Sequence, residues 1–175
     1  MRLWLQQLNE IEAPICLALS HALRPVRVRR LFAFVSRLGD GVFWYSLIAI
    51  MPLVDGWNGA RAGLHMLLTG GTVLALYKTL KKATRRERPC HYVADVTAAI
   101  PPLDHYSFPS GHTLHAVSFT VVALHYYPGL AWVLIPFTLL IAGSRVVLGL
   151  HYPSDVLAAA GIGFMLAYAG ILLAF

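Results

Sequence analysis

The chain has 175 residues, of which 58% are hydrophobic and only 13% are charged, and its mean hydropathy is +0.64. Soluble domains carry roughly a quarter charged residues, so this composition excludes an ordinary water-soluble fold. The net charge of +6 does not indicate a nucleic-acid partner, because most basic residues lie in two clusters, 24–37 and 78–88, and not in a free-standing basic tail. Cys16 and Cys90 show neither a pairing pattern nor metal-ligand spacing.

The length suits a single domain, residues 1–175, with five or six bilayer crossings of about 20 residues each. We therefore expect an all-α integral-membrane bundle of six helices. The first segment, 1–22, is interrupted by charges and by Pro14, and we expect it either to cross the membrane or to lie on its surface. It lacks the features of a removable signal peptide. A basic connector, 24–30, follows, and the other predicted helices cover residues 31–54, 61–82, 112–127, 129–148 and 155–175.

The second predicted helix contains the unusual sequence Gly39-Asp40-Gly41 in its first half. A carboxylate inside an apolar span is costly unless it has a partner. We expect Asp40 either to pair with Arg37 or another polar neighbour, or to mark a break that shortens the span.

Helix order brings three polar clusters to one membrane face. The loop 83–109 joins the third and fourth predicted helices, and a Tyr127-Pro128-Gly129 turn reverses the chain after the fourth. The fifth helix then returns to the face where the third one ended, whether or not the first segment spans. The residues expected to meet there are Lys81, Arg88, Ser110, Arg145, His151 and Asp155.

Ser110 follows Pro109 and precedes an apolar run, which is typical of a helix N-cap. A helix start offers unpaired N–H groups and the positive end of the helix dipole to an anion. Gly111 lets a phosphate oxygen approach the backbone closely. The alternative is a capped membrane helix with His112 in its first turn and no ligand.

His151 and Asp155 are four residues apart, and Pro153 is placed to begin the last helix. Asp155 can accept the proton-bearing ring nitrogen of His151, fix its tautomer and stabilise the charged imidazole. Alternatively, Asp155 only caps the helix while His151 lies at the lipid interface. Arg145, close to the end of an apolar span, is either a functional residue or one that reaches to the interface.

Arg88 precedes Pro89, which biases its backbone towards extended conformations. An extended Arg88 can present its planar guanidinium to a phosphate in a bidentate manner. The alternative for Arg88 and Lys81 is a basic rim that faces solvent or lipid headgroups.

Three motifs occur in order: Lys81-(six residues)-Arg88-Pro89, Pro109-Ser110-Gly111-His112, and Ser144-Arg145-(five residues)-His151-(three residues)-Asp155. Together they resemble the signatures of the type 2 phosphatidic acid phosphatase family (PAP2), which in turn resembles the vanadium haloperoxidases. No defining position is substituted. The flanking helices fit the six-helix membrane core of that family.

The resemblance implies a role for each motif residue. By similarity, His151 is the nucleophile that forms a phosphohistidine, and Asp155 orients it. His112 protonates the departing oxygen and then activates the water that releases phosphate. The resemblance implies neither a metal nor another cofactor. The phosphoryl oxygens are held by Lys81, Arg88, Ser110, Gly111 and Arg145.

The resemblance predicts an integral-membrane lipid phosphatase whose partners are the bilayer and a lipid phosphate, with no nucleic acid. We expect undecaprenyl diphosphate as the substrate, with phosphatidylglycerol phosphate and phosphatidic acid as the other candidates. One alternative is a phosphotransferase that passes the phosphoryl group to another lipid from the same site. Another is a lipid-binding protein of the same fold without turnover. Haloperoxidase activity is disfavoured, because those relatives are soluble.

Orientation in the membrane has two conflicting indications. The basic connector 24–30 lies on the same face as the three clusters, and basic residues usually mark the cytoplasmic side. The resemblance to bacterial phosphatases implies an outward, periplasmic face instead. We expect a multi-pass protein of the cell (inner) membrane with its active site on the periplasmic or extracellular face.

Overall fold

The structure is a computed structural model that describes residues 2–22, 25–102 and 104–174, so Arg24, in the predicted basic connector, lies outside the described residues. Every regular element in these ranges is helical, which confirms the all-α prediction for them. The elements are α1 (Arg2–Ala22), α2 (Val26–Arg37), the π-helical turn η1 (Leu38–Val42), α3 (Phe43–Thr84), α4 (Pro89–Tyr92), α5 (Gly111–Tyr126), the 3₁₀ turn η2 (Pro128–Leu130), α6 (Ala131–Val147) and α7 (Pro153–Ala174).

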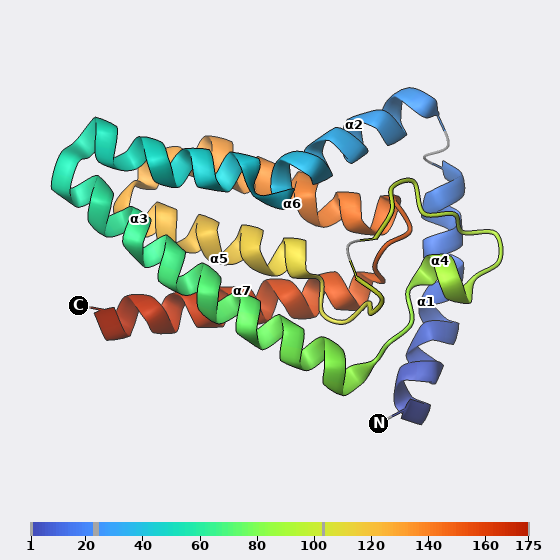
Figure 1. Cartoon of the computed structure of the whole chain (residues 1–175). Coiled ribbons are helices and arrows are strands. Elements are labelled where there is room, and N and C mark those ends of the chain that lie inside the picture. Colours follow the sequence, from blue (N-terminus) through green and yellow to red (C-terminus); the bar gives the residue numbers. More distant parts are fainter. Residues whose placement is uncertain (1, 23–24, 103, 175) are drawn as a thin grey trace.

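The second and third predicted helices belong to one helical path. α2 joins α3 through a kink at η1, where Gly41 leaves helical backbone angles. α3 in turn bends where Asp55 and Gly56 leave them. Gly56 has a φ of +50°, which glycine adopts without a Cβ clash. The turn predicted at 55–59 is therefore the bend at which α3 folds back on itself (Figure 1).

α5 is the central helix of the bundle and packs against α3, α6 and α7 (Figure 1). The main apolar cluster joins Trp44 of α3, Phe119 of α5 and Ile141 of α6, all of them buried. Burial of large aromatic and branched side chains from three elements fixes how these helices sit relative to one another.

The outer surface of the bundle is also apolar. Most of the exposed large hydrophobic side chains lie on α3, α6 and α7, among them Leu53, Val54, Trp132, Leu157 and Leu173. A surface of this kind suits lipid better than water. Within the described residues, three helical stretches are long and apolar enough to cross a membrane: Val26–Tyr92, Pro128–Val147 and Pro153–Leu173. The protein is thus an all-helical membrane protein, and the count of six crossings stays a prediction.

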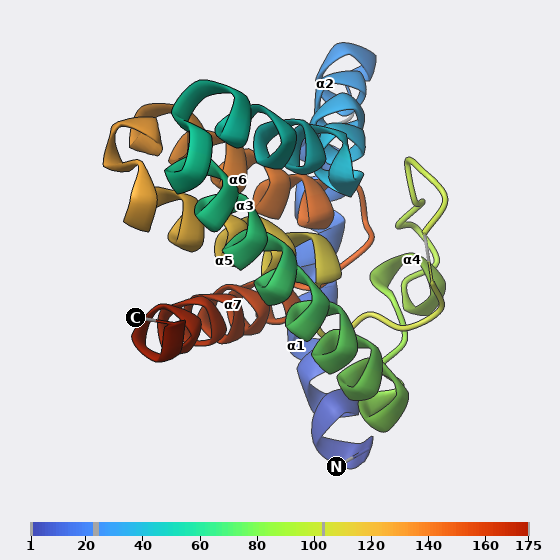
Figure 2. The ribbon, with the colours of Figure 1, turned by 60° about the vertical axis from the view of Figure 1, so that its left-hand side comes forward.

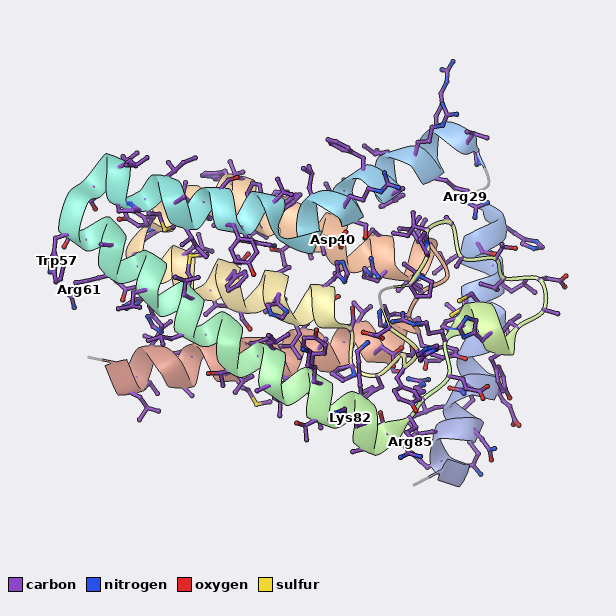
Figure 3. The ribbon with its side chains drawn as sticks, in the orientation of Figure 1. Arg29, Asp40, Trp57, Arg61, Lys82 and Arg85 are labelled. Atoms are coloured by element: carbon purple, nitrogen blue, oxygen red, sulfur yellow. The ribbon has the colours of Figure 1, made fainter. Side chains whose placement is uncertain are left out.

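α1 runs across the ends of the other helices and not alongside them (Figures 1 and 2). This orientation favours the surface-lying alternative for residues 1–22. The loop between α3 and α5 and the turn between α6 and α7 lie at the same end. The bend of α3, with Trp57 and Arg61, forms the opposite end (Figure 3). The polar clusters therefore gather at one end of the bundle, as helix order predicts.

Candidate active site

A cavity of about 670 Å³ lies between η1, α3, α5 and the loop that precedes α5. Residues of all three clusters line it, so segments far apart in sequence do meet. The lining includes Lys81, Arg88, Gly111, His112, Arg145 and His151. The two other predicted site residues, Ser110 and Asp155, are fully buried and are not part of this lining.

Arg88 reaches the cavity because the chain turns sharply after α3. Arg85 ends that helix with a left-handed backbone, φ +49°, and its N–H bonds the Lys81 carbonyl. Arg88 then has the extended backbone expected before Pro89, with φ −81° and ψ 153°. Arg88 is 1% exposed, and its Nη1 donates to the Leu150 carbonyl at 2.7 Å.

The contact between Arg88 and His151 indicates which nitrogen of the imidazole carries the proton. Arg88 Nη1 lies 3.1 Å from His151 Nε2. A guanidinium has donors and no acceptor, so Nε2 accepts this bond with its lone pair. In the neutral ring the proton therefore sits on Nδ1. His151 thus presents a lone pair at Nε2 beside the cationic groups of the cavity.

Asp155 lies on the other side of the ring. Its Oδ2 is 3.6 Å from His151 Nδ1, close enough for charge pairing but longer than a hydrogen bond. The same oxygen accepts the Tyr152 N–H at 2.9 Å and the Ser107 hydroxyl. Asp155 is therefore fixed behind His151, but the Ser107 hydroxyl, 3.5 Å from Nδ1, and not Asp155 is the hydrogen-bond partner of the ring. The orienting role of Asp155 stays a prediction.

The surroundings of His151 favour its neutral form. Burial, followed by the positive charges of Arg88, Arg145 and Lys81, lowers the pKa of His151 well below its usual 6.5. Each of these causes disfavours the imidazolium. A neutral imidazole at physiological pH is the form that a nucleophilic histidine requires.

The start of α5 has the predicted N-cap residue but not the predicted cap bond. Ser110 precedes the helix with extended backbone angles. Its hydroxyl makes a 3.0 Å hydrogen bond with the Thr113 hydroxyl and none with a backbone N–H. The helix N–H groups beside Gly111 therefore keep their capacity for an anion. The phosphate-binding role of Ser110 stays a prediction.

Arg145 is a buried cation with an unused donor. It lies in the last turn of α6, is 2% exposed, and bonds the Ser36 hydroxyl through Nη1. Its Nε has no hydrogen-bond partner within the described part of the chain. A buried polar group without a partner is costly. The phosphate-binding role of Arg145, which lines the cavity, stays a prediction.

Asp104 is a site residue that the sequence does not single out. Its Oδ1 accepts from Lys81 Nζ and from Arg88 Nη2, both at 2.7 Å. Burial alone would raise the pKa of this carboxyl, but the hydrogen bonds and charges of Lys81 and Arg88 bring it below its usual value. Asp104 is therefore ionised, and it forms salt bridges with the two cations that are predicted to bind phosphate. No spacing in the sequence marks this loop carboxylate.

Replacing Asp104 by asparagine is expected to lower KM for a phosphate substrate by a factor of a few, with little change in kcat. Both cations then lose a competing carboxylate, and the gain is modest because Asp104 is 39% exposed and partly screened. Inhibition by inorganic phosphate should tighten in parallel. Asp95→Asn, in the same loop, exposed and outside the cavity lining, is the matched control. A higher KM for the Asp104 variant would contradict this competition.

Arg86 is a second residue that motif spacing misses. Its side chain is 1% exposed and bridges two carboxylates, Glu12 of α1 and Asp155 of α7, each at 2.7 Å. Its Nε donates to Asn9 Oδ1 at 2.9 Å. In the sequence it is one basic residue of the cluster 78–88. The structure shows that it joins α1 to the carboxylate behind His151.

Arg86→Leu is expected to lower the free energy of unfolding by about 3–5 kcal/mol, because it leaves two buried carboxylates without a counter-charge. Thermal unfolding in detergent measures the loss. Arg85→Leu is the control, since Arg85 is exposed at the end of α3 (Figure 3). Equal stability of the two variants would show that the buried bridge contributes nothing.

A family model described as the PAP2 superfamily matches residues 59–175. The chain is 32% identical to phosphatidylglycerophosphatase B of Bacillus subtilis, a match covering 77% of this chain and 69% of that protein. It is 26% identical to undecaprenyl-diphosphatase of Sulfolobus acidocaldarius, covering 81% and 68%. It is 28% identical to lipid A 1-phosphatase of Rhizobium etli, covering 80% and 68%.

Two solved structures share this fold. The crystal structure of a transmembrane PAP2-type phosphatidylglycerolphosphate phosphatase from Bacillus subtilis superposes with a TM-score of 0.70 at 26% identity, over 99% of this chain and 95% of that one. Aquifex aeolicus LpxE gives a TM-score of 0.75 over 93% and 95%, and its 23% identity shows the fold alone.

Proposed function

Because the chain belongs to the PAP2 superfamily, we propose that it hydrolyses the terminal phosphate of a membrane lipid through a phosphohistidine on His151. Similarity to lipid phosphatases over most of the chain supports a phosphatase that acts on lipids. The observation that carries the proposed mechanism is the 3.1 Å contact of Arg88 Nη1 with the ring of His151. Its Nε2 lone pair faces Arg88, while Asp155 lies behind Nδ1.

In the first step the phosphate displaces Asp104 from Lys81 and Arg88. The Arg145 Nε and the N–H groups at the start of α5 complete its binding site. The Arg88 N–H that bonds His151 Nε2 turns to a phosphoryl oxygen and so frees the lone pair. His151 Nε2 then attacks phosphorus, a P–N bond forms, and the bond to the leaving oxygen breaks. A proton from His112 passes to that oxygen. The cations stabilise the charge that gathers on the phosphoryl oxygens in the transition state.

In the second step His112, now neutral, takes a proton from a water molecule whose oxygen attacks phosphorus. The P–N bond breaks, its electron pair returns to His151, and inorganic phosphate leaves. Asp155 stabilises the positive charge that His151 carries while it is phosphorylated. The mechanism assigns no step to a metal ion.

We propose undecaprenyl diphosphate as the preferred substrate. Two curated relatives are an undecaprenyl-diphosphatase, at 26% identity, and undecaprenyl-diphosphatase BcrC of Bacillus subtilis, at 34%. Lys78 and Lys82 also line the cavity, and these further cations suit a headgroup with a second phosphate. We propose an active site on the outward face of the cell (inner) membrane, as the resemblance to bacterial phosphatases of this family implies.

Phosphate release by detergent-solubilised protein in EDTA tests the proposed function. We expect release from undecaprenyl diphosphate to exceed that from phosphatidylglycerol phosphate and from phosphatidic acid. Release from any of these lipids in chelator supports a phosphatase that needs no metal. If the folded protein released phosphate from none of them, the phosphatase proposal would fail, and transfer to an acceptor lipid or binding alone would be tested next.

A further inference from the structure

Asp40 takes no part in the steps above, yet it contacts one of the two histidines that do. It lies on η1, its side chain is 36% exposed, and its Oδ1 is bonded to His112 Nε2. Asp40 also lines the cavity. It precedes the segment that matches the family model, residues 59–175, so the family motifs do not include it. Both alternatives for Asp40 are met: it pairs with a polar neighbour, His112, and it lies at a kink in the helix.

The backbone on both sides of Asp40 has an unusual conformation and packs closely on α6. η1 is a π-helical turn, a local widening of a helix that often occurs at functional sites. Gly41 has a φ of +140°, which a residue with a Cβ rarely adopts. A Cβ on Gly39 would lie 3.0 Å from Ile141 Cδ1, so a larger residue there would require the Ile141 side chain to shift. Figure 3 shows Asp40 on η1 near the start of α5.

The two ring nitrogens of His112 have different surroundings. A carboxylate accepts hydrogen bonds, so Nε2 carries a proton towards Asp40. Nδ1 makes no hydrogen bond within the described residues, and it remains for the substrate. A neutral ring with its proton on Nε2 has only a lone pair at Nδ1. His112 therefore donates a proton from Nδ1 only as an imidazolium.

The charges around His112 make that imidazolium costly without a counter-charge. Burial of the ring disfavours its charged form, and the positive charge of Arg145, on α6, opposes a second positive charge beside it. Asp40, from η1, acts in the opposite direction. A nearby carboxylate stabilises a charged imidazole, so Asp40 supplies what an acid role for His112 requires.

We propose that Asp40 is a positioning residue for the general acid: it holds Nε2 of His112 and stabilises the imidazolium, so that Nδ1 protonates the leaving oxygen. This inference rests on the proposed function. As the bond from phosphorus to the leaving oxygen breaks, the Nδ1 proton moves to that oxygen. His112 is left neutral, with its remaining proton on Nε2 facing Asp40 and a lone pair on Nδ1. That lone pair then accepts the proton of the attacking water.

Leaving-group dependence separates this role from a structural one. The leaving alkoxide of phosphatidic acid needs a proton, whereas p-nitrophenolate leaves without one. In the first turnover, Asp40→Asn is expected to slow cleavage of phosphatidic acid by about 10²-fold and that of p-nitrophenyl phosphate by no more than a few-fold. Asp40→Glu, which keeps the carboxylate, should retain most of the rate with both compounds. Asp95→Asn is the matched control and should change neither.

Equal losses with the two compounds, or no loss with either, would overturn the role of Asp40 while leaving the proposed function intact. An unmodified chain that released no phosphate from any lipid would instead remove the proposed function and this inference with it. If Asp40→Asn does not fold, nitrogen NMR of the unmodified chain decides, with His112→Gln for assignment. Neutral His112 should carry its proton on Nε2, and a proton on Nδ1 would overturn the proposal.

Discussion

Replacing His151 by glutamine is expected to reduce phosphate release by at least about 10⁴-fold, because loss of a catalytic nucleophile removes most of the rate enhancement. Glutamine is close to histidine in size and keeps an amide that can accept a bond from Arg88. The cavity should therefore retain its cations and its affinity for lipid phosphate. Phosphate release from a lipid in EDTA gives the activity, and retention of the labelled lipid gives the binding.

His91→Gln is the control for this substitution, because His91 is exposed on α4 and does not line the cavity. It should leave the rate unchanged. Undiminished hydrolysis by the His151 variant would exclude His151 as the nucleophile. Loss of both hydrolysis and lipid binding would point to a role in substrate binding alone.

Arg88→Lys is expected to lower kcat by about 10²–10³-fold, the usual cost of losing one main charge-stabilising group at a transition state. Lysine keeps the positive charge but has no planar fork. In the structure that fork contacts the Leu150 carbonyl, His151 Nε2 and Asp104 at once. A single ammonium cannot make these bonds together, so both the phosphoryl contact and the orientation of His151 suffer.

Arg85→Lys is the matched control for Arg88→Lys. Arg85 is three residues away, exposed, and absent from the cavity lining. We expect it to keep the unmodified kcat and KM. If Arg88→Lys also kept its kcat, charge alone would be sufficient at this position, and the bidentate contact would have no part in catalysis.

The positions of the motif residues were predictable because they depend on helix order. An apolar segment must cross the bilayer, so two crossings return the chain to its starting face. That reasoning brings Lys81, Arg88, Ser110, Arg145, His151 and Asp155 together. Four of the six, Lys81, Arg88, Arg145 and His151, line one cavity, and Ser110 and Asp155 are buried beside them. The extended backbone of Arg88 was likewise predictable, since it follows from Pro89 alone.

The residues that support the motif residues were not predictable. Their contacts depend on how the helices are rotated and shifted against one another, and not on the order of the helices along the chain. Asp40 meets His112 across 72 positions, at a kink in the helix that the sequence does not locate. Arg86 contacts Asp155, which lies 69 positions away in the sequence. In the sequence alone, Arg86 cannot be told from its exposed basic neighbours, which are typical of a solvated surface. Ser110 begins α5 as predicted, but the sequence did not show that its hydroxyl would bond Thr113.

Phosphorylation of His151 during turnover is the central claim, and trapping it in a His112→Gln variant tests it most directly. With p-nitrophenyl phosphate the first step needs no acid, whereas the second has lost its base, so the phosphohistidine should accumulate. We expect a burst of p-nitrophenolate equal to the amount of protein, and mass spectrometry after a basic quench should find the phosphoryl group on His151. Turnover without a burst, or a phosphoryl group on any other residue, would contradict the mechanism.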